Sequence, residues 1–339
     1  PIIWSILITS LSTSTIITMA SHHWMLAWLG LELNTLSILP VIMKTPHPRA
    51  TEATMKYFLI QALAAAMILF ASTMNAWQTG LWEITHTTHI TTTIITMAIL
   101  LKLGVAPVHL WYPEVLQGTT LNMALLISTW QKLAPLSLLY MMHNNLPNNL
   151  LLLTGLLSAL LGGLAGLNQT QTRKIMAHSS IAHMGWILIA LNMTPKLTTL
   201  ALSTYMIMTT AMFSSLSTST MKTITDMGTT WSSSPTMTAL TLLTLTSLGG
   251  LPPLTGFMPK LLILNELTTK PLLPMATTLA LTSLPSLFFY IRMAHTTTLT
   301  APPNTTNIEY KWRFNATPLP THTATTALAL LLMPLSPVL

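Results

Sequence analysis

The sequence predicts an all-α polytopic membrane protein with about 11 transmembrane helices, two of them broken, in an inverted repeat of five plus five helices and one extra helix. Three observations support this prediction. Hydrophobic residues make up 51% of the chain and charged residues only 6%, whereas about 25% is typical of a soluble domain. Long apolar stretches alternate with short linkers, and two of these stretches carry the same proline-containing interruption.

The predicted membrane spans follow one another with little sequence between them. A span needs about 20 mainly apolar residues, and the linkers are rich in Pro, Gly, Asn, Thr and charged residues. The first stretch lacks the basic start and small-residue cleavage site of a secretory signal, so we expect a membrane helix there. We expect one transmembrane domain over 1–339, with spans at 2–20, 23–43, 54–75, 90–112, 120–142, 148–167, 173–192, 197–219, 236–265, 272–294 and 321–338.

Lys and Arg residues collect on one side of the predicted membrane. Nine of the 14 belong to the linkers after even-numbered spans, two belong to the opposite linkers, and three lie inside spans. Because positive residues favour the negative side, we expect the N-terminus on that side and the C-terminus on the other. The nine are Lys44, Arg49, Lys56, Arg173, Lys174, Lys222, Arg292, Lys311 and Arg313, and the two are Lys196 and Lys270.

Spans 90–112 and 236–265 share one interruption. The first reads GVAPVHLWYPE from Gly104 and the second GLPPLTGFMPK from Gly250. Proline removes a backbone donor and clashes with the preceding turn, so we expect both helices to break. The copies lie 146 residues and five spans apart, and an odd number of spans reverses their orientation.

Paired breaks of this kind are typical of transport sites on inverted repeats, although Pro and Gly are also common in ordinary membrane helices. The repeat predicts how the domain is organised. We expect a first copy over 1–146, a second copy over 147–295, a linker over 296–320 on the negative side and a last helix over 321–338.

Four ionisable residues lie deep inside predicted spans. Lys102 and Lys260 flank the two interruptions, Lys132 lies in span 120–142, and Glu32 lies in span 23–43. A charge in hydrocarbon is costly, so such residues by default mark an ion or proton path. Burial disfavours an ammonium and a nearby carboxylate favours it, so a Glu–Lys pair of variable spacing can load and release a proton.

Some of these residues also have a structural interpretation. A lysine near the end of a span can extend its charge to the headgroups, which fits Lys132 better than the more central Lys102. Glu32 has the alternative of a buried structural acid, and Glu114 is either a gate or an interfacial residue.

Three histidines lie in or near the same stretches. An imidazole titrates near neutral pH and therefore suits proton relay, and a hydrogen-bonded core histidine is the alternative. Two histidines that bind one metal on a helix face are spaced by four, whereas His178 and His183 are spaced by five. The three candidates are His109, His178 and His183.

Several chemistries are excluded. A chain without cysteine offers no thiolate for a zinc finger or an iron–sulfur cluster. There is no glycine-rich phosphate loop and no nucleophile elbow. The net charge is +7, but the basic residues form no cluster with aromatics, so we expect no nucleic-acid partner. We therefore expect no metal and no bound cofactor on this chain.

The stretches HHWMLAWLGLELNTLSILPVIM, ILLKLGVAPVHLWYPEVLQG, QTQTRKIMAHSSIAHMGWILIALN and LTSLGGLPPLTGFMPKLLIL together resemble the antiporter-like membrane-arm subunits of respiratory complex I, the NADH:ubiquinone oxidoreductase. The resemblance covers essentially the whole chain. It implies a mitochondrial inner-membrane protein with its N-terminus in the matrix and its C-terminus in the intermembrane space. Other complex I subunits, including neighbouring antiporter-like ones, and lipids would be its partners.

The resemblance also implies roles for the four buried residues. Glu32 would modulate Lys102 on the first broken helix, Lys132 would be the central lysine of a hydrophilic axis, and Lys260 would lie on the second broken helix toward the exit or the next subunit. Electron transfer from NADH to ubiquinone would drive protons along them. FMN, iron–sulfur clusters and ubiquinone would belong to other subunits.

Two other functions share these features. A cation/proton antiporter subunit would carry the same broken helices and lysines. A scaffold of the membrane arm without its own proton path would need the four residues only for stability. Co-purification with flavin and iron–sulfur proteins, and the effect of neutralising the charges on transport, distinguish the three.

Overall fold

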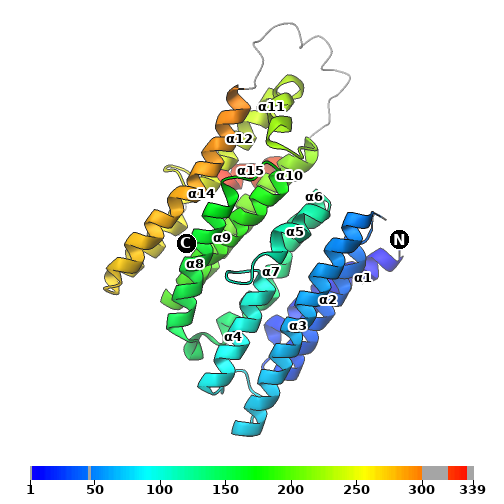
Figure 1. Ribbon diagram of the computed structural model, residues 1–339, viewed down its shortest axis with the longest axis vertical. Helices are drawn as coiled ribbons and strands as arrows, with labels where there is room; N and C mark the ends of the chain where they lie inside the picture. Colours follow the sequence, from blue (N-terminus) through cyan, green and yellow to red (C-terminus); the bar gives the residue numbers. More distant parts are fainter. Residues whose placement is uncertain (1, 45–46, 300–319, 334–339) are drawn as a thin grey trace. The chain divides into compact units, whose positions relative to one another are not determined.

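The computed structural model describes residues 2–44, 47–299 and 320–333. This part of the chain is helical, with no β-strand, as the sequence predicts (Figure 1). The contacts within the molecule divide the chain into unit 1, Pro1–Leu157, and unit 2, Ser158–Leu339. The division falls inside a helix, eleven residues after the predicted end of the first copy at 146, so the copy boundary stays a prediction.

Unit 1 is a bundle built around one long helix. Its helices are α1 (Ile2–Ala20), α2 (Trp24–Ile42), α3 (Pro48–Thr79), α4 (His89–Leu103), α5 (Trp111–Gly118), α6 (Leu121–Ser128), α7 (Trp130–Met141), the short 3-10 helix η1 (His143–Asn145), and the first half of α8 (Asn148–Gly166). Helix α2 packs between α1 and α3, and α3 contacts both α4 and α5. Helix α7 packs against α1, α2 and α4, which brings the lysine-bearing helices together.

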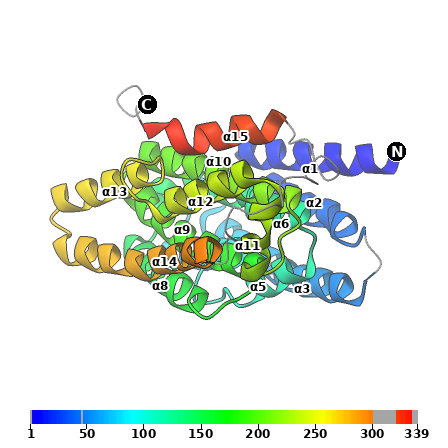
Figure 2. The same ribbon diagram turned by 90° about the horizontal axis from the view of Figure 1, so that it is seen from above.

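Unit 2 repeats this pattern and adds helices. Its helices are the second half of α8, then α9 (Thr172–Met193), α10 (Pro195–Thr218), α11 (Ile224–Ser233), α12 (Pro235–Gly249), α13 (Phe257–Thr269), α14 (Leu273–Leu299) and α15 (Pro320–Leu331). Helix α10 contacts both α12 and α13, as α3 contacts α4 and α5 in unit 1. Figure 2 shows α15 lying along α10 and α13 running beside α14.

Both predicted breaks are present, and they begin alike. Helix α4 is followed by Gly104 with φ 69° and α12 by Gly250 with φ 79°, a left-handed conformation that glycine adopts without strain. The peptide bonds Ala106–Pro107 and Pro252–Pro253 are both cis. Shifted by 146 residues, the bounds of α4 coincide with those of α12, and the bounds of α1 coincide with those of α8. These two pairs of helices therefore keep the same bounds in both copies, while the inverted orientation of the copies stays a prediction.

The hydroxyl side chains explain how so threonine-rich a chain forms membrane helices. Within the helices, serine and threonine hydroxyls donate mostly to the carbonyl three residues before. On α4, for example, Thr92 donates to His89 at 2.8 Å and Thr96 to Thr93 at 2.9 Å. Such bonds satisfy each hydroxyl without water.

Seven helices of the described part are long and apolar enough to cross a membrane: α1, α2, α3, α8, α9, α10 and α14. The two broken spans are shorter because each is divided at its break. Span 120–142 is also divided, into α6 and α7, which meet at Thr129 (φ −113°, ψ −73°). The count of about 11 spans stays a prediction, and residues 334–338 of the last one lie outside the described residues.

Some helix ends differ from the sequence-based expectation. Helix α3 starts at Pro48, not 54, because the His47 ring accepts from the Arg49 N–H at 3.1 Å and Pro48 occupies the first turn. Helix α11 lies in a predicted linker, where Thr223 and Asp226 form a capping box. Helix α14 extends to Leu299, and residues 300–319 of the predicted linker lie outside the described residues.

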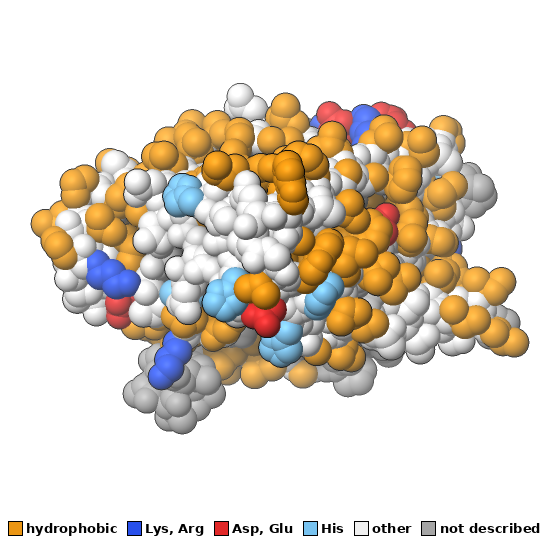
Figure 3. Space-filling view, turned by 90° about the horizontal axis from the view of Figure 1, so that it is seen from below, with side chains coloured by type: hydrophobic (Ala, Val, Ile, Leu, Met, Phe, Trp, Pro, Cys, Tyr) orange, Lys and Arg blue, Asp and Glu red, His pale blue; other side chains and the backbone are white. Residues whose placement is uncertain are grey.

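The outer surface is apolar, as a lipid-facing surface requires. Side chains such as Ile3, Ile8, Phe70 and Leu281 are more than half exposed. On the face in Figure 3, hydrophobic side chains cover much of the surface, and charged side chains are scattered. The ionisable residues of the predicted spans are therefore to be sought inside each unit.

Candidate functional site

Lys102 lies in the last turn of α4, next to the first break. Its side chain is only 6% exposed, and its Nζ has no hydrogen-bond partner among the described residues. The Glu32 carboxylate of α2 is close enough to attract it electrostatically, although the two form no ion pair within 4 Å. The Gln61 side chain of α3 donates to the Lys102 carbonyl at 3.3 Å. Gln61 therefore caps one of the carbonyls that the break leaves without a helical partner.

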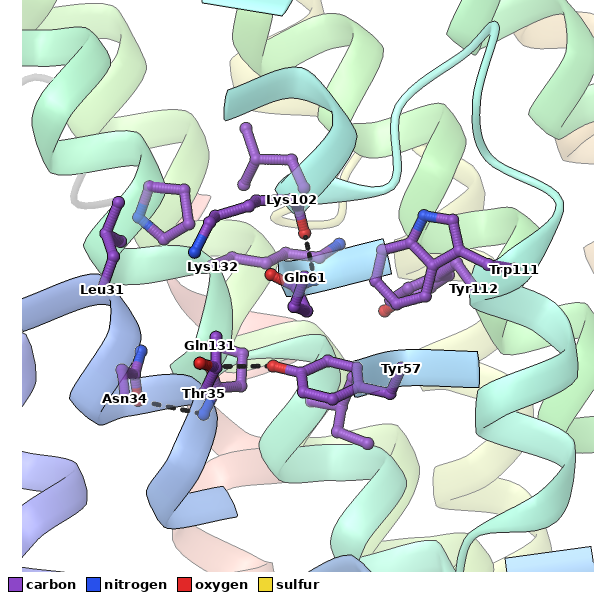
Figure 4. A pocket seen from close by; sticks show the side chains of 13 residues that line it. Leu31, Asn34, Thr35, Tyr57, Gln61, Lys102, Trp111, Tyr112, Gln131 and Lys132 are labelled. Carbon is purple, nitrogen blue, oxygen red and sulfur yellow. Dashed lines mark hydrogen bonds between the residues drawn. The ribbon is translucent and has the colours of Figure 1, made fainter. Parts of the chain in front are cut away.

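Lys102 and Lys132 line one cavity of unit 1 (Figure 4). The space open to the centre of a water molecule is about 20 Å³, which suits about one water. Lys132, on α7, is 3% exposed, and its ammonium lies 5.2 Å from the centre of the Tyr112 ring. Lys132 is as buried as Lys102, so the structural alternative, in which its ammonium extends to the headgroups, does not occur within unit 1.

Neutral polar side chains form one wall of this cavity. Gln131 of α7 donates to the Asn34 side chain of α2 at 3.1 Å, and the Tyr57 hydroxyl of α3 donates to Gln131 at 3.4 Å. Figure 4 shows both bonds beside the two lysines. Three helices thus meet in one hydrogen-bonded set next to the ionisable groups.

Two other predicted residues of unit 1 lie apart from the cavity lining. Glu114, on α5, is exposed and forms a 2.6 Å ion pair with Lys56 of α3, which also pairs with Glu52 at 2.6 Å. His109 is buried within the first break, with its Nδ1 3.3 Å from the Pro107 carbonyl oxygen. Glu114 therefore fits the interfacial role better than the gate.

In unit 2, Lys260 reaches back across the second break. Its ammonium donates to the Gly249 carbonyl, the last residue of α12, at 2.9 Å. The C-terminal end of a helix carries partial negative charge, so a cation is stabilised there. The ammonium also lies 5.8 Å from the centre of the Trp186 ring. Lys260 thus caps the break in which it participates.

A second cavity, of about 10 Å³ by the same measure, is lined by Lys260 and His183. The His183 ring lies 5.7 Å from the Tyr205 ring. His178, five residues earlier on α9, is buried near Gly162 and Gly166 of α8 and does not line this cavity. Unit 2 therefore brings His183, but not His178, to the half-buried Lys260.

The arrangement can hold and pass protons within each unit. Unit 1 has two buried amines, a carboxylate within electrostatic range and space for water, while unit 2 has an amine and an imidazole on one small cavity. In the part of the chain that the structure describes, no group of three His, Cys, Asp or Glu residues could hold a metal ion.

The sequence reasoning missed the neutral members of the site. Asn34, Tyr57, Gln61 and Gln131 do not titrate near neutral pH, so a search for ionisable residues passes over them. The available signal was an amide side chain inside an apolar span, as in LELNTL and FLIQALAAAM. Such a group needs a partner, and here the partners are helices of the same bundle.

The chain matches two family models along most of its length. Residues 21–285 match "NADH:quinone oxidoreductase/Mrp antiporter, TM", and residues 287–339 match "NADH dehydrogenase subunit 2 C-terminus". It is 54% identical to the NADH-ubiquinone oxidoreductase chain 2 of Salmo salar, over 99% of this chain and 97% of that protein. It is 51% identical to the protein of the same name from Coturnix japonica, over 98% and 96%.

Solved structures show the same fold. A chain of respiratory complex I from Thermus thermophilus matches with a TM-score of 0.86 and 24% identity, over 100% of this chain and 79% of that one. A chain of the Mrp complex from Dietzia matches with a TM-score of 0.77 and 16% identity, over 85% and 59%. The likeness therefore covers the helices that carry all the residues described above.

Proposed function

Because this chain belongs to the NADH:quinone oxidoreductase/Mrp antiporter family of membrane proteins, we propose that it relays protons through its buried lysines. It is a membrane subunit of respiratory complex I and has its role in NADH:ubiquinone oxidoreduction. It is a multi-pass protein of the inner membrane, and other complex I subunits are its partners.

One observation carries the proposal. Lys102 and Lys132 come from different helices, are almost completely buried, and line one water-sized cavity. Ionisable residues inside a membrane bundle are costly, and those that face an internal cavity are typical of ion and proton paths. A proton-carrying lysine needs a route to its neighbour, and one water between two amines provides such a route.

Glu32 gives the relay a control element. A carboxylate near an amine favours the charged ammonium, and its withdrawal favours release of the proton. Movement of Glu32 relative to Lys102 therefore changes the free energy of protonating Lys102 without any chemical change in this chain. Redox chemistry elsewhere in the complex would supply the force for that movement.

The energy involved is modest. Moving one charge across a potential of about 150 mV costs about 3.5 kcal/mol. Electrostatic coupling between an amine and a carboxylate a few ångströms apart is of this order, about 4 kcal/mol at 4 Å in an effective dielectric constant of about 20. A change in the Glu32–Lys102 distance can therefore alter the electrostatic free energy by an amount comparable to the cost of moving one proton across the membrane.

Lys260 and His183 extend the same chemistry into unit 2. The proposed relay uses Glu32, Lys102 and Lys132 in unit 1 and Lys260 in unit 2, with His183 as an additional proton carrier. The proposal further assigns FMN, iron–sulfur clusters and ubiquinone to other subunits, lipids to the exposed apolar surface, the N-terminus to the matrix and the C-terminus to the intermembrane space.

Substitution of Lys102 by Met tests the proposal. Complex carrying Lys102→Met should assemble in normal amount, because Gln61 bonds the backbone carbonyl of residue 102, which the substitution keeps. The number of protons pumped per NADH oxidised in vesicles should fall about tenfold or more, as expected for loss of a positioned proton-transfer group.

Lys196→Met is the matched control, because Lys196 is an exposed lysine at the start of α10. It should pump like the unsubstituted complex. Normal pumping by assembled Lys102→Met complex would contradict the relay and leave a scaffold role. Sodium-driven proton exchange by an isolated small assembly would favour the antiporter alternative.

A further inference from the structure

Two amide side chains join α2 to α7 beside the ionisable residues of unit 1. Gln131 donates to Asn34 at 3.1 Å, and Tyr57 donates to Gln131 at 3.4 Å. Asn34 and Tyr57 are each 2% exposed. A buried amide is costly without a partner, so the three side chains hold one another in place.

The hydrogen bond between Asn34 and Gln131 joins α2 and α7 close to their ionisable residues. Gln131 immediately precedes Lys132 on α7, and Asn34 follows Glu32 by two residues on α2. Leu31, Asn34 and Thr35 belong to the face of α2 that lines the cavity. Glu32 is not part of that lining and lies just beside this face, about 100° around the helix from Leu31 and about 60° from Thr35.

A second contact defines which way Glu32 turns. One helical turn before Glu32, the Trp28 indole donates to the Ala65 carbonyl of α3 at 3.1 Å. Glu32 therefore lies on the side of α2 that turns toward α3, where Gln61 bonds the Lys102 carbonyl. Rotation of α2 about its own axis would change the distance from Glu32 to Lys102.

We propose that Asn34 and Gln131 are positioning residues, whose hydrogen bond fixes the rotation of α2 and with it the separation of Glu32 from Lys102. The inference rests on the proposed relay. Neither amide gains or loses a proton near neutral pH. The bond between them therefore keeps its strength while the charges on either side of it change, which an ion pair at the same place would not.

A hydrogen bond between membrane helices can also serve packing alone. The two roles differ in what they predict. If the bond only packs α2 on α7, its loss lowers the amount of complex, and each complex that assembles pumps normally. If the bond positions Glu32, its loss lowers the number of protons moved per NADH by the complexes that do assemble.

The test uses purified complex in vesicles, with proton translocation per NADH measured for each variant. Gln131→Leu and Asn34→Leu should each lower this ratio about twofold or more, the size expected for a residue that modulates coupling. The exchange Asn34→Gln with Gln131→Asn keeps the combined length of the two amides and should restore the ratio. Ser37→Ala and Ser137→Ala are the controls, because these hydroxyls donate only within their own helices.

Each outcome decides the matter. If both Leu variants pump normally while Lys102→Met does not, the positioning role is wrong and the relay stands. If Lys102→Met pumps normally, the relay falls and the positioning role falls with it. If the Leu variants pump poorly and the exchange does not restore them, a specific amide bridge is excluded. Should Gln131→Leu fail to assemble, Gln131→Asn, which is one methylene shorter, breaks the same bond with less disturbance.

Discussion

The two broken helices use one backbone design and different side chains. In unit 1 the end of α4 is capped by Gln61 of α3, and the buried amine belongs to Lys102 of α4 itself. In unit 2 a single residue, Lys260 of α13, caps the end of α12 and supplies the amine. Two tasks that unit 1 divides between residues are thus combined in unit 2.

The comparison explains why the lysines stand at different positions of the repeat. The residue 146 positions before Lys260 is Glu114, which lies exposed in an ion pair with Lys56. In both units, however, a lysine lies at the C-terminal end of the first half-helix, where partial negative charge favours it. A lysine therefore occupies the same place in the fold of both units, although the two lysines stand at different positions of the sequence repeat.

The largest effect is expected at Gly256, in the second break. A side chain there would collide with the backbone carbonyl of Ser247 in α12. Gly256→Ala should therefore force the two halves apart, destabilise the protein by about 3 kcal/mol or more, and abolish assembly on native gels. In the first break the corresponding residue is the exposed Leu110, so the close approach is specific to unit 2.

Gly249→Ala is the matched control for that substitution. Gly249 is a helical glycine whose added carbon would meet its nearest neighbours at 3.7 Å, an ordinary contact. It should assemble normally. Equal loss of complex in both variants would show that the collision at residue 256 is not the cause.

The second largest effect distinguishes the capping of a broken helix from the supply of the amine. Lys260→Met should lower both the amount of complex and pumping, because it removes the amine and leaves the end of α12 without its cap, at about 1–3 kcal/mol. Lys102→Met should lower pumping alone, and Gln61→Met should lower mainly the amount of complex. Native gels and proton translocation by the same samples measure the two quantities.

The converse result is equally clear. If Lys260→Met lowers pumping but assembles as well as Lys102→Met, the bond to Gly249 contributes nothing to the break. The division of tasks between the units would then be wrong.

The smallest effect is expected in α11, the short helix that precedes the second broken helix. The backbone N–H of Thr223 donates to the Asp226 carboxylate at 2.8 Å, at the start of α11, and holds the pKa of Asp226 below its usual range. Its stabilisation of α11 is therefore full at neutral pH and is lost as the pH falls through the lowered pKa. Asp226→Ala should lower hydrogen-exchange protection of α11 about two- to fivefold at neutral pH.

Asp226→Asn keeps an acceptor that does not titrate. Protection of α11 should then remain nearly independent of pH below neutrality. A decline with acid as steep as that of the unsubstituted protein would assign the pH dependence to another group.

Much of this architecture follows from the sequence, for identifiable reasons. The breaks were predictable because Gly104 and Gly250 begin matching motifs whose prolines cannot continue a helix. The buried lysines were predictable because a charge in an apolar span is rarely incidental. Such signals are local and need no knowledge of the neighbouring helices.

What could not be predicted depends on packing between distant segments. Gln61 reaches residue 102 and Gln131 reaches Asn34 only because α2, α3 and α7 pack together. The sequence left two interpretations of Lys132 open, because the distance of a residue from the end of a span does not tell which neighbouring helices cover it. Lys260 capping Gly249 required the break to fold back, which the motif alone does not specify.

The central claim is that Lys102 and Lys132 serve one proton path through one cavity. The most direct measurement is the number of protons translocated per NADH by Lys102→Met, Lys132→Met and the double variant, in assembled complex in vesicles. The account predicts that each single variant lowers the ratio and that the double variant lowers it no further than the more severe single one. Additive losses would indicate separate paths, and an unchanged ratio in all three would contradict the relay.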